Sequence, residues 1–170
     1  MEPTTKHFFS KSRDAADLGP GIQANWRKVL SNFHPTHFTV DGHTYHTPEH
    51  AFHAAKSRCS NDSSMAELFT LGGDVGPLPA DAKLMGGRKM YKQRGAVLNT
   101  TLWNLERDNA QRAIIEARLQ QDELFRLILM AVDAQNVRLV LFERAGSINN
   151  QRRGACARAS AYITIAGQFD

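Results

Sequence analysis

The sequence predicts a mainly α domain with a small β component, an α+β fold. Helix signals start at Thr47, Thr101 and Asp122, and the last two begin stretches with helical spacing of apolar residues. The β-prone segments are short, and the clearest of them form one hairpin around Asp41-Gly42. A length of 170 residues suits one domain, residues 1–170, because a chain of this size buries roughly two-thirds of its unfolded surface.

The hairpin is predicted over residues 37–45. Asp41-Gly42 stands between the β-prone segments Phe38–Val40 and His43–Tyr45, and Asp-Gly in that position is a strong turn signal. A further short strand is expected at residues 7–9, ahead of a polar loop. The hairpin delivers the chain directly into the first predicted helix.

That helix carries the main candidate functional residues. Thr47 is a good N-cap, and Pro48 is accepted in a first helical turn. Glu49, His53 and Lys56 follow at i, i+4 and i+7, so they share one face. With a rise of 1.5 Å per residue, Glu49 and Lys56 stand roughly 10 Å apart along the axis, a spacing suited to bracketing a small ligand. The same spacing is also typical of a solvated charged face.

The histidines raise the question of a metal site, because six of the seven lie within residues 34–53. His46-x-x-Glu49-His50 spells the inverted zinc-protease pattern, which requires both histidines on one helix. Pro48 in the first turn leaves His46 ahead of the helix, so the two rings are not expected to converge. We therefore predict that the chain has no metal ligand set.

A basic segment follows a weak helix and a Gly/Pro-rich loop in residues 60–82. Gly86-Gly87 within the basic segment would let the backbone approach an anion closely. Two interpretations stay open, a solvated surface and a segment that holds phosphate. The segment has five cations and no acid: Lys83, Arg88, Lys89, Lys92 and Arg94.

The C-terminal half is predicted to contain two helices and a strand. Thr101 is a candidate N-cap of the first helix, and Trp103 near its start suits either a core anchor or an aromatic wall for a flat ring. The second helix is expected from Asp122 to Val132, and the strand from Val137 to Phe142. The apolar positions are Leu102, Leu105, Ile114 and Ile115 in the first helix and Leu124, Phe125, Ile128 and Leu129 in the second.

Composition narrows the class of protein. A hydrophobic content of 42% and a charged content of 22% are those of a soluble globular protein, and no apolar run approaches the ~20 residues of a membrane span. Two cysteines are too few for a disulfide framework, which favours a cytoplasmic location. The net charge of +4 and the pI near 9.3 favour anionic partners slightly.

Residues 30–56 contain three motifs, which are Leu30-Ser31-Asn32-Phe33, Phe38-Thr39-Val40-Asp41-Gly42-x-x-Tyr45 and Glu49-His50-x-Phe52-x-x-x-Lys56. Together they resemble the NADAR family. The similarity is specific over that segment and looser over residues 100–143, where Trp103 and Leu141-Phe142-Glu143 align.

The family includes N-glycosidases of riboflavin-biosynthesis intermediates and hydrolases of ADP-ribosylated guanine. The resemblance implies a single compact NADAR-like domain that cleaves the bond between a phosphorylated ribose or ADP-ribose and a nitrogenous base or amine. It implies no metal and no organic cofactor. The implied partner is a phosphorylated ribosyl or ADP-ribosyl small molecule, or an ADP-ribosylated nucleic acid, with no role for a membrane.

The chemistry suggests roles for the residues of the Thr47 helix. Glu49 in the first turn meets the positive end of the helix dipole, which suits stabilising a cationic sugar or activating water. Lys56 would bind phosphate, or attack C1 of the sugar as a neutral amine and form an imine. His53 suits a proton shuttle, and equally a buried hydrogen-bonded histidine. The resemblance implies that substrate is bound by Asn32, Phe33, Phe52, Arg88, Trp103, Asn149 and Asn150.

The sequence departs from the family pattern at several points. The downstream Asp-x-x-Trp-Gly of the family is absent, and Asn149-Asn150 lies near the expected position of its Asp. His53 stands where the family has Gln, and the spacing from Gly87-Arg88 to Trp103 is longer than usual. Two alternatives to the enzyme therefore stay open: a catalytically weakened module that binds ADP-ribose or a nucleotide, and a basic nucleic-acid-binding protein.

Overall fold

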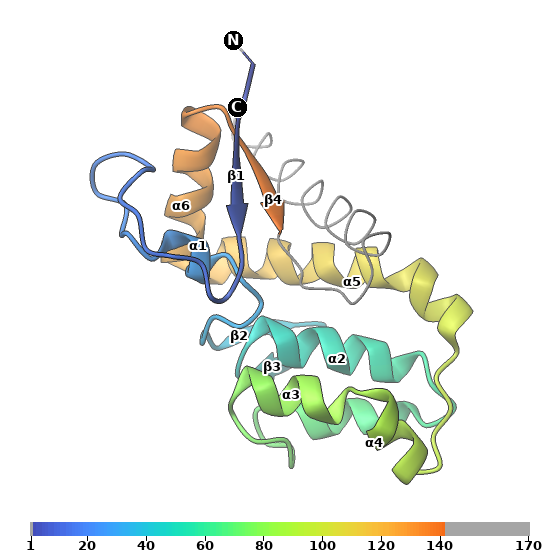
Figure 1. Ribbon diagram of the computed structural model, residues 1–170. Coiled ribbons are helices and arrows are strands. Elements are labelled where there is room, and N and C mark those ends of the chain that lie inside the picture. Colours follow the sequence, from blue (N-terminus) through green and yellow to red (C-terminus); the bar gives the residue numbers. More distant parts are fainter. Residues whose placement is uncertain (1, 142–170) are drawn as a thin grey trace. The chain divides into compact units, whose positions relative to one another are not determined.

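The structure is a computed structural model that describes residues 2–141 (Figure 1). Helices dominate this range and the strands are short, which confirms the predicted α+β class with a small β component. None of the helices within it has the length and apolarity needed to cross a bilayer. In chain order the elements are β1 (Thr4–Phe8), α1 (Trp26–Val29), β2 (Phe38–Val40), β3 (His43–Tyr45), α2 (Pro48–Arg58), the 3₁₀ helix η1 (Ser63–Phe69), α3 (Pro79–Met85), α4 (Arg88–Gln93), α5 (Thr100–Gln121), α6 (Glu123–Ala134) and β4 (Val137–Leu141).

The described residues group into two compact units. One comprises residues 2–31 and 118–141, and the other comprises residues 32–117. The single domain over residues 1–170 therefore stays a prediction. The second unit holds all the described candidate site residues, which are Asn32, Phe33, Glu49, Phe52, His53, Lys56, Arg88 and Trp103.

The first unit is built on a parallel pair of strands. β1 pairs with β4, from Thr4 opposite Val137 to Phe8 opposite Leu141, and α6 contacts both β4 and α1 (Figure 1). The strand expected at residues 7–9 thus begins earlier, and the strand expected to end at Phe142 is described as far as Leu141. α6 buries one helical face, formed by Phe125, Ile128, Leu129 and Val132.

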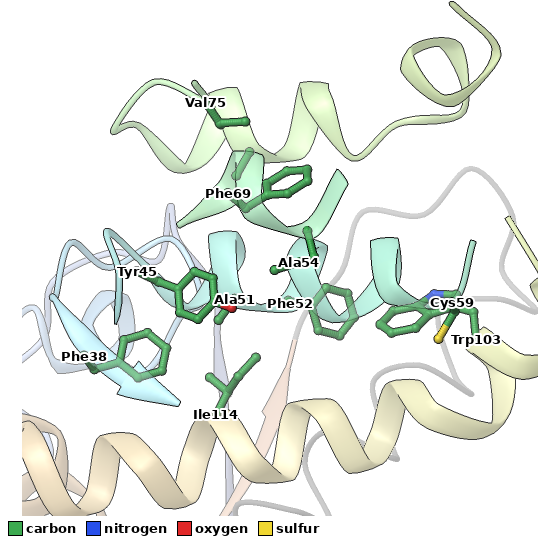
Figure 2. Close-up of a cluster of buried hydrophobic side chains, with 12 residues drawn as sticks. Phe38, Tyr45, Ala51, Phe52, Ala54, Cys59, Phe69, Val75, Trp103 and Ile114 are labelled. Atoms are coloured by element: carbon green, nitrogen blue, oxygen red, sulfur yellow. The ribbon is translucent and has the colours of Figure 1, made fainter. Parts of the chain in front are cut away.

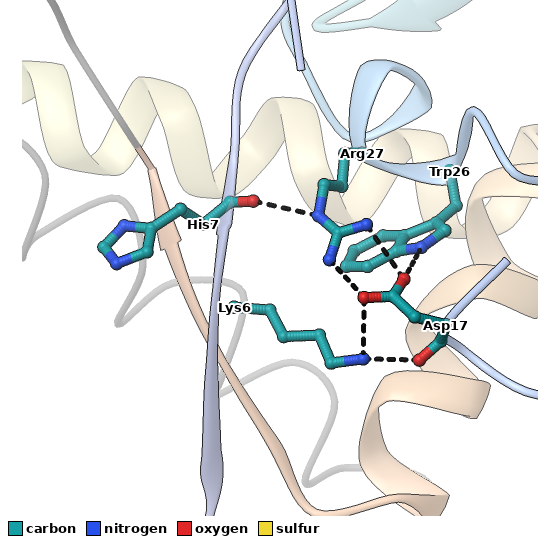
Figure 3. A network of polar contacts seen from close by, with 5 residues as sticks. All are labelled: Lys6, His7, Asp17, Trp26 and Arg27. Carbon is teal, nitrogen blue, oxygen red and sulfur yellow. Dashed lines mark hydrogen bonds and ion pairs between the residues drawn. The ribbon is translucent and has the colours of Figure 1, made fainter. Parts of the chain in front are cut away.

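A carboxylate network fixes the N-terminal loop of this unit (Figure 3). Asp17 accepts hydrogen bonds from Trp26 Nε1 at 3.0 Å and from the two terminal nitrogens of Arg27 at 2.9 and 2.6 Å. Lys6 pairs with the Asp17 carboxylate at 3.1 Å and also donates to the Asp17 carbonyl oxygen, while Arg27 Nε donates to His7 O. The hydrogen bonds from Arg27 hold the pKa of Asp17 far below its usual range.

The start of α6 confirms the predicted helix boundary. Asp122 is the N-cap, and its side chain accepts from the Phe125 backbone N–H at 3.0 Å. The buried Arg118 donates to Asp122 at 2.9 Å and to Val29 O at 3.0 Å, and its guanidinium lies 3.8 Å from the centre of the Phe125 ring. This buried arginine therefore links α6 to the segment around α1.

In the second unit, the predicted hairpin is confirmed. β2 and β3 pair antiparallel, with Phe38 opposite Tyr45 and Val40 opposite His43. Asp41 and Gly42 both have positive φ, 52° and 78°, as a two-residue type I′ turn requires.

The core of the second unit surrounds α2, which η1 and α3 contact (Figure 2). Phe52 and Trp103 meet edge to face there, with ring centres 5.0 Å apart. Trp103 is thus anchored in the core, as one of its two interpretations predicted. The buried cluster comprises Phe38, Tyr45, Ala51, Phe52, Ala54, Cys59, Ala66, Phe69, Val75, Ala82, Trp103 and Ile114.

The predicted start of α5 is wrong by two residues, because the N-cap is Asn99 and not Thr101. Asn99 Oδ1, not the Thr101 hydroxyl, accepts from the backbone N–H of Leu102 at 3.0 Å, and the helix begins at Thr100. Leu102 and Leu105 are 40% and 69% exposed, because the buried face of the helix runs through Trp103 and Ile114 instead. The predicted Gly/Pro loop is also shorter than expected, since Pro79 occupies the first position of α3.

Candidate functional site

The first turn of α2 positions Glu49. Thr47 has extended backbone angles and its hydroxyl accepts from the His50 backbone N–H at 3.4 Å, so the predicted N-cap is confirmed. The N–H of Glu49, which has no partner within the helix, donates to the backbone oxygen of Asn32 at 3.0 Å. The loop before the hairpin therefore helps to hold the helix start.

Glu49 and His53 form a largely buried pair. Their side chains are 12% and 10% exposed, and His53 Nε2 lies 3.2 Å from Glu49 Oε1. The interpretation of this face as solvated is therefore wrong for these two residues. A carboxylate oxygen accepts, so Nε2 carries the proton in this contact. Nδ1 is buried against Gly86, where an added Cβ would stand 2.0 Å away, and it has no hydrogen-bond partner in the described residues.

Lys56 completes the face one turn further along. Its Nζ donates to Gly86 O at 2.8 Å and lies 5.6 Å from the centre of the Tyr91 ring. Burial lowers the pKa of Lys56, the Arg88 cation lowers it further, and Glu49 opposes the shift. Within the described residues no direct ion pair joins Glu49 and Lys56. Lys56 donates to the Gly86 carbonyl, whereas Glu49 contacts His53, whose ring lies against Gly86.

Gly86 is a contact point that sequence reasoning did not assign to this role. Under the phosphate-holding interpretation its backbone would approach an anion. In the structure its missing side chain makes room for His53, and its carbonyl accepts a hydrogen bond from Lys56. The surrounding cations, Lys83, Arg88, Lys89, Lys92 and Arg94, are all exposed, and Lys83 Nζ lies 5.5 Å from the Phe33 ring centre. A role for them in holding phosphate stays a prediction.

Asn32 lies beside Glu49 and is itself held by a residue that the sequence did not indicate. Its side-chain amide exchanges two hydrogen bonds with Gln111 of α5, at 2.9 and 3.1 Å. A signal was present, because a glutamine on the buried face between Trp103 and Ile114 needs a polar partner. The sequence alone could not identify that partner, because Asn32 is far from Gln111 along the chain.

The remaining candidates differ in their placement. Phe52 and Trp103 are each 9% exposed in the core cluster, where Phe52 also contacts the His53 ring edge to face. Asn149 and Asn150 lie outside the described residues. The structure therefore brings Glu49, His53 and Lys56 together with Asn32 and the segment around Gly86.

His50 points away from this face and is fully buried. Its Nε2 donates to Gly76 O at 2.9 Å, so in the neutral ring Nδ1 accepts from the Thr47 hydroxyl at 2.8 Å. Burial lowers the pKa of His50, which favours that neutral form. Both ring nitrogens of His50 thus have protein partners. His46 ahead of the helix faces His37, with 3.4 Å between the nearest nitrogens, and its ring centre lies 5.5 Å from that of His50, so the expectation that the His46 and His50 rings would not converge is wrong.

The α+β fold of the chain has a counterpart among solved structures. It is similar to the NMR structure of the E. coli protein YbiA, with a TM-score of 0.66 and 20% sequence identity, and the match covers 99% of this chain and 86% of that chain. No protein-family model matches the chain, and a comparison with curated proteins finds no match. The likeness to YbiA establishes the fold.

Proposed function

We propose that the chain is a member of the NADAR family and an N-glycosidase. It would hydrolyse the bond between a phosphorylated ribose or ADP-ribose and a nitrogenous base or amine. The observation that carries the proposal is the cluster of Glu49, His53 and Lys56 on α2, in which burial and a neighbouring cation lower the pKa of the lysine. The fold shared with YbiA, a NADAR-family protein, and the motifs of residues 30–56 support the family assignment.

The charges of the cluster suit this reaction. Breaking an N-glycosidic bond leaves positive charge on the sugar and an electron pair on the departing nitrogen. Glu49, held by His53 and by its first-turn N–H, would face the sugar cation or take a proton from water. His53 would move protons between Glu49 and the departing base, since its ring already contacts the carboxylate.

Lys56 offers a covalent route. The lowered pKa increases the neutral fraction of its amine at a given pH. The amine would form a bond to C1 of the sugar while the C1–nitrogen bond to the base breaks and the base leaves with a proton. The product is a glycosylamine, whose sugar ring would open by breaking the bond between C1 and the ring oxygen; that oxygen takes up the amine proton and C1 forms an imine with the lysine. Hydrolysis of this imine by water would return the free amine and release the sugar.

The test is base release from a panel of ribosylated and ADP-ribosylated amines, free and within oligonucleotides, measured by mass spectrometry. We expect release by the wild-type chain and loss of release in Glu49→Gln. A chain whose melting temperature rises with ADP-ribose, but which releases no base from any member of the panel, would be the weakened binding module instead. No release and no thermal shift would remove both functions.

A further inference from the structure

Gln111 places an amide side chain at a core position, where it pairs with the amide of Asn32. Gln111 is 2% exposed, on the α5 face that also contributes Trp103 and Ile114 to the core. Burying an amide costs free energy unless it is hydrogen-bonded, and an apolar residue of similar size would avoid that cost. Here both amides are paired, Asn32 Nδ2 to Gln111 Oε1 at 2.9 Å and Gln111 Nε2 to Asn32 Oδ1 at 3.1 Å.

Asn32 transmits this contact to the start of α2. Its side chain is fixed by Gln111, while its backbone oxygen accepts the N–H of Glu49 at 3.0 Å. That N–H belongs to the first turn, where helical backbone donors have no partner within the helix. The chain of contacts therefore runs from α5 through Asn32 to the residue that holds His53.

We propose that Gln111 is a positioning residue for Glu49. It fixes Asn32, and Asn32 fixes the backbone from which the Glu49 carboxylate projects, so Gln111 sets the carboxylate's position without touching the substrate. The inference rests on the proposed function for its catalytic consequence. Small displacements of a reacting group are costly in rate, on the order of 10²-fold for about 1 Å.

Two variants of Gln111 separate positioning from packing. Gln111→Met keeps the approximate length of the side chain and removes both hydrogen bonds, whereas Gln111→Glu keeps the acceptor for Asn32 Nδ2. The matched control is Tyr45→Phe, which removes a different buried hydrogen bond of the same unit, the 2.9 Å bond from Arg58 to the Tyr45 hydroxyl.

The first measurement is amide hydrogen exchange, which needs no substrate. In Gln111→Met we expect exchange at Glu49 to accelerate about tenfold or more relative to exchange at Ala54 in the same helix, with a smaller change in Gln111→Glu, because a freed first-turn N–H opens without the helix unfolding. Tyr45→Phe should leave the ratio of the two exchange rates unchanged. Equal acceleration at Glu49 and Ala54 in Gln111→Met would overturn the proposal.

The second measurement is turnover with whichever substrate the wild type hydrolyses. We expect kcat of Gln111→Met to fall about 10- to 100-fold with KM changed by less than about threefold, partial recovery in Gln111→Glu, and near-normal kcat in Tyr45→Phe. Normal kcat in a folded Gln111→Met chain would refute the positioning role. If the wild type releases no base, only the proposed function is refuted. The exchange ratio still decides whether Gln111 holds Glu49, because that measurement needs no substrate.

Discussion

Glu49 is the residue on which the proposed chemistry depends most. Replacing it with glutamine keeps its size and its acceptor for His53 Nε2 but removes the negative charge that would meet the sugar cation. We expect Glu49→Gln to lower kcat by about 10²-fold or more, with little change in melting temperature. The matched control is Glu67→Gln, which alters a 64% exposed carboxylate paired with His43. Comparable losses in both variants would mean that no specific role belongs to Glu49.

The pH dependence of Lys56 tests whether its amine reacts. A nucleophilic amine works unprotonated, so kcat should rise with pH through a pKa below the ordinary lysine value. Arg88→Ala removes a cation that disfavours the ammonium, so the pKa should rise and the rising limb should move to higher pH. Arg94→Ala, which changes another exposed cation of the segment, should leave the limb in place. A kcat that instead falls as pH rises through this range would assign Lys56 a purely cationic role.

Among the structural elements, the junction between α3 and α4 depends on one glycine. A Cβ at Gly86 would stand 2.0 Å from His53 Nδ1, so the ring or the junction must move. We expect Gly86→Ala to destabilise the fold by about 1–3 kcal/mol, as overpacking does, and to lower activity by displacing His53 and the carbonyl that holds Lys56. Urea unfolding and turnover measure the two effects. Gly72→Ala, where an added Cβ meets nothing within 4 Å, is the control; equal stability of the two variants would contradict the close approach.

Neighbouring residues in the sequence predicted the elements whose boundaries depend on those residues alone. The Asp41-Gly42 turn, the cap at Thr47 and the start of the helix near Asp122 need only neighbouring residues, and all three are confirmed. The start of α5 was not decidable in this way, because both Asn99 and Thr101 are suitable caps. In the structure Asn99 is the cap that is used.

The candidate site was predictable only in part, because some of its contacts join residues that are remote in sequence. Helical spacing brings Glu49 and His53 within reach of each other, and the structure agrees. Their burial depends on Gly86 and Phe69, which are remote in sequence and carry no signal of proximity. The partnership of Asn32 with Gln111 was equally hidden, since two amides can pair across any distance along a chain.

For the whole molecule, resistance to acid should depend on the Asp17 network. Its folded pKa is strongly lowered, so the stabilisation is fully present above the unfolded value of about 3.9 and is lost as the pH falls toward the folded value. The side chain is 40% exposed, which limits the effect. We expect Asp17→Asn to cost about 1–2 kcal/mol at pH 7, with the difference from wild type narrowing below pH ~4.

Urea unfolding at neutral and acid pH measures this cost. Asp14→Asn, which breaks a single exposed ion pair with Lys28, should cost no more than about 0.5 kcal/mol. An Asp17→Asn deficit that stays constant, or grows, as the pH falls would contradict the assignment of a lowered pKa to this carboxylate.

The charge of the whole chain bears on the size of the substrate. A small ligand that meets one or two cations loses little affinity with salt, whereas a strand loses affinity with a log–log slope of roughly 0.7 per neutralised phosphate. The net charge is only +4, and the basic segment has no run of interleaved aromatic residues for base stacking, since its one aromatic residue, Tyr91, is buried. We therefore expect a weak salt dependence of KM and a preference for a free ribosyl-amine or ADP-ribosyl metabolite. A preference for an ADP-ribosylated oligonucleotide, with a steep slope that flattens in Lys89→Ala/Lys92→Ala, would reverse this expectation.

The pairing of β1 with β4 has a consequence for the order of events during synthesis. Thr4 lies opposite Val137, so β1 leaves the ribosome long before the strand with which it pairs. The segment 32–117 is complete before that strand emerges and contains its own hydrophobic cluster. It can therefore collapse early, whereas β1 must wait with an open edge that is prone to pairing with other chains. The entropic cost of joining such distant segments grows only slowly with their separation. The delay in synthesis nevertheless leaves β1 without its partner and exposed to aggregation in the nascent chain.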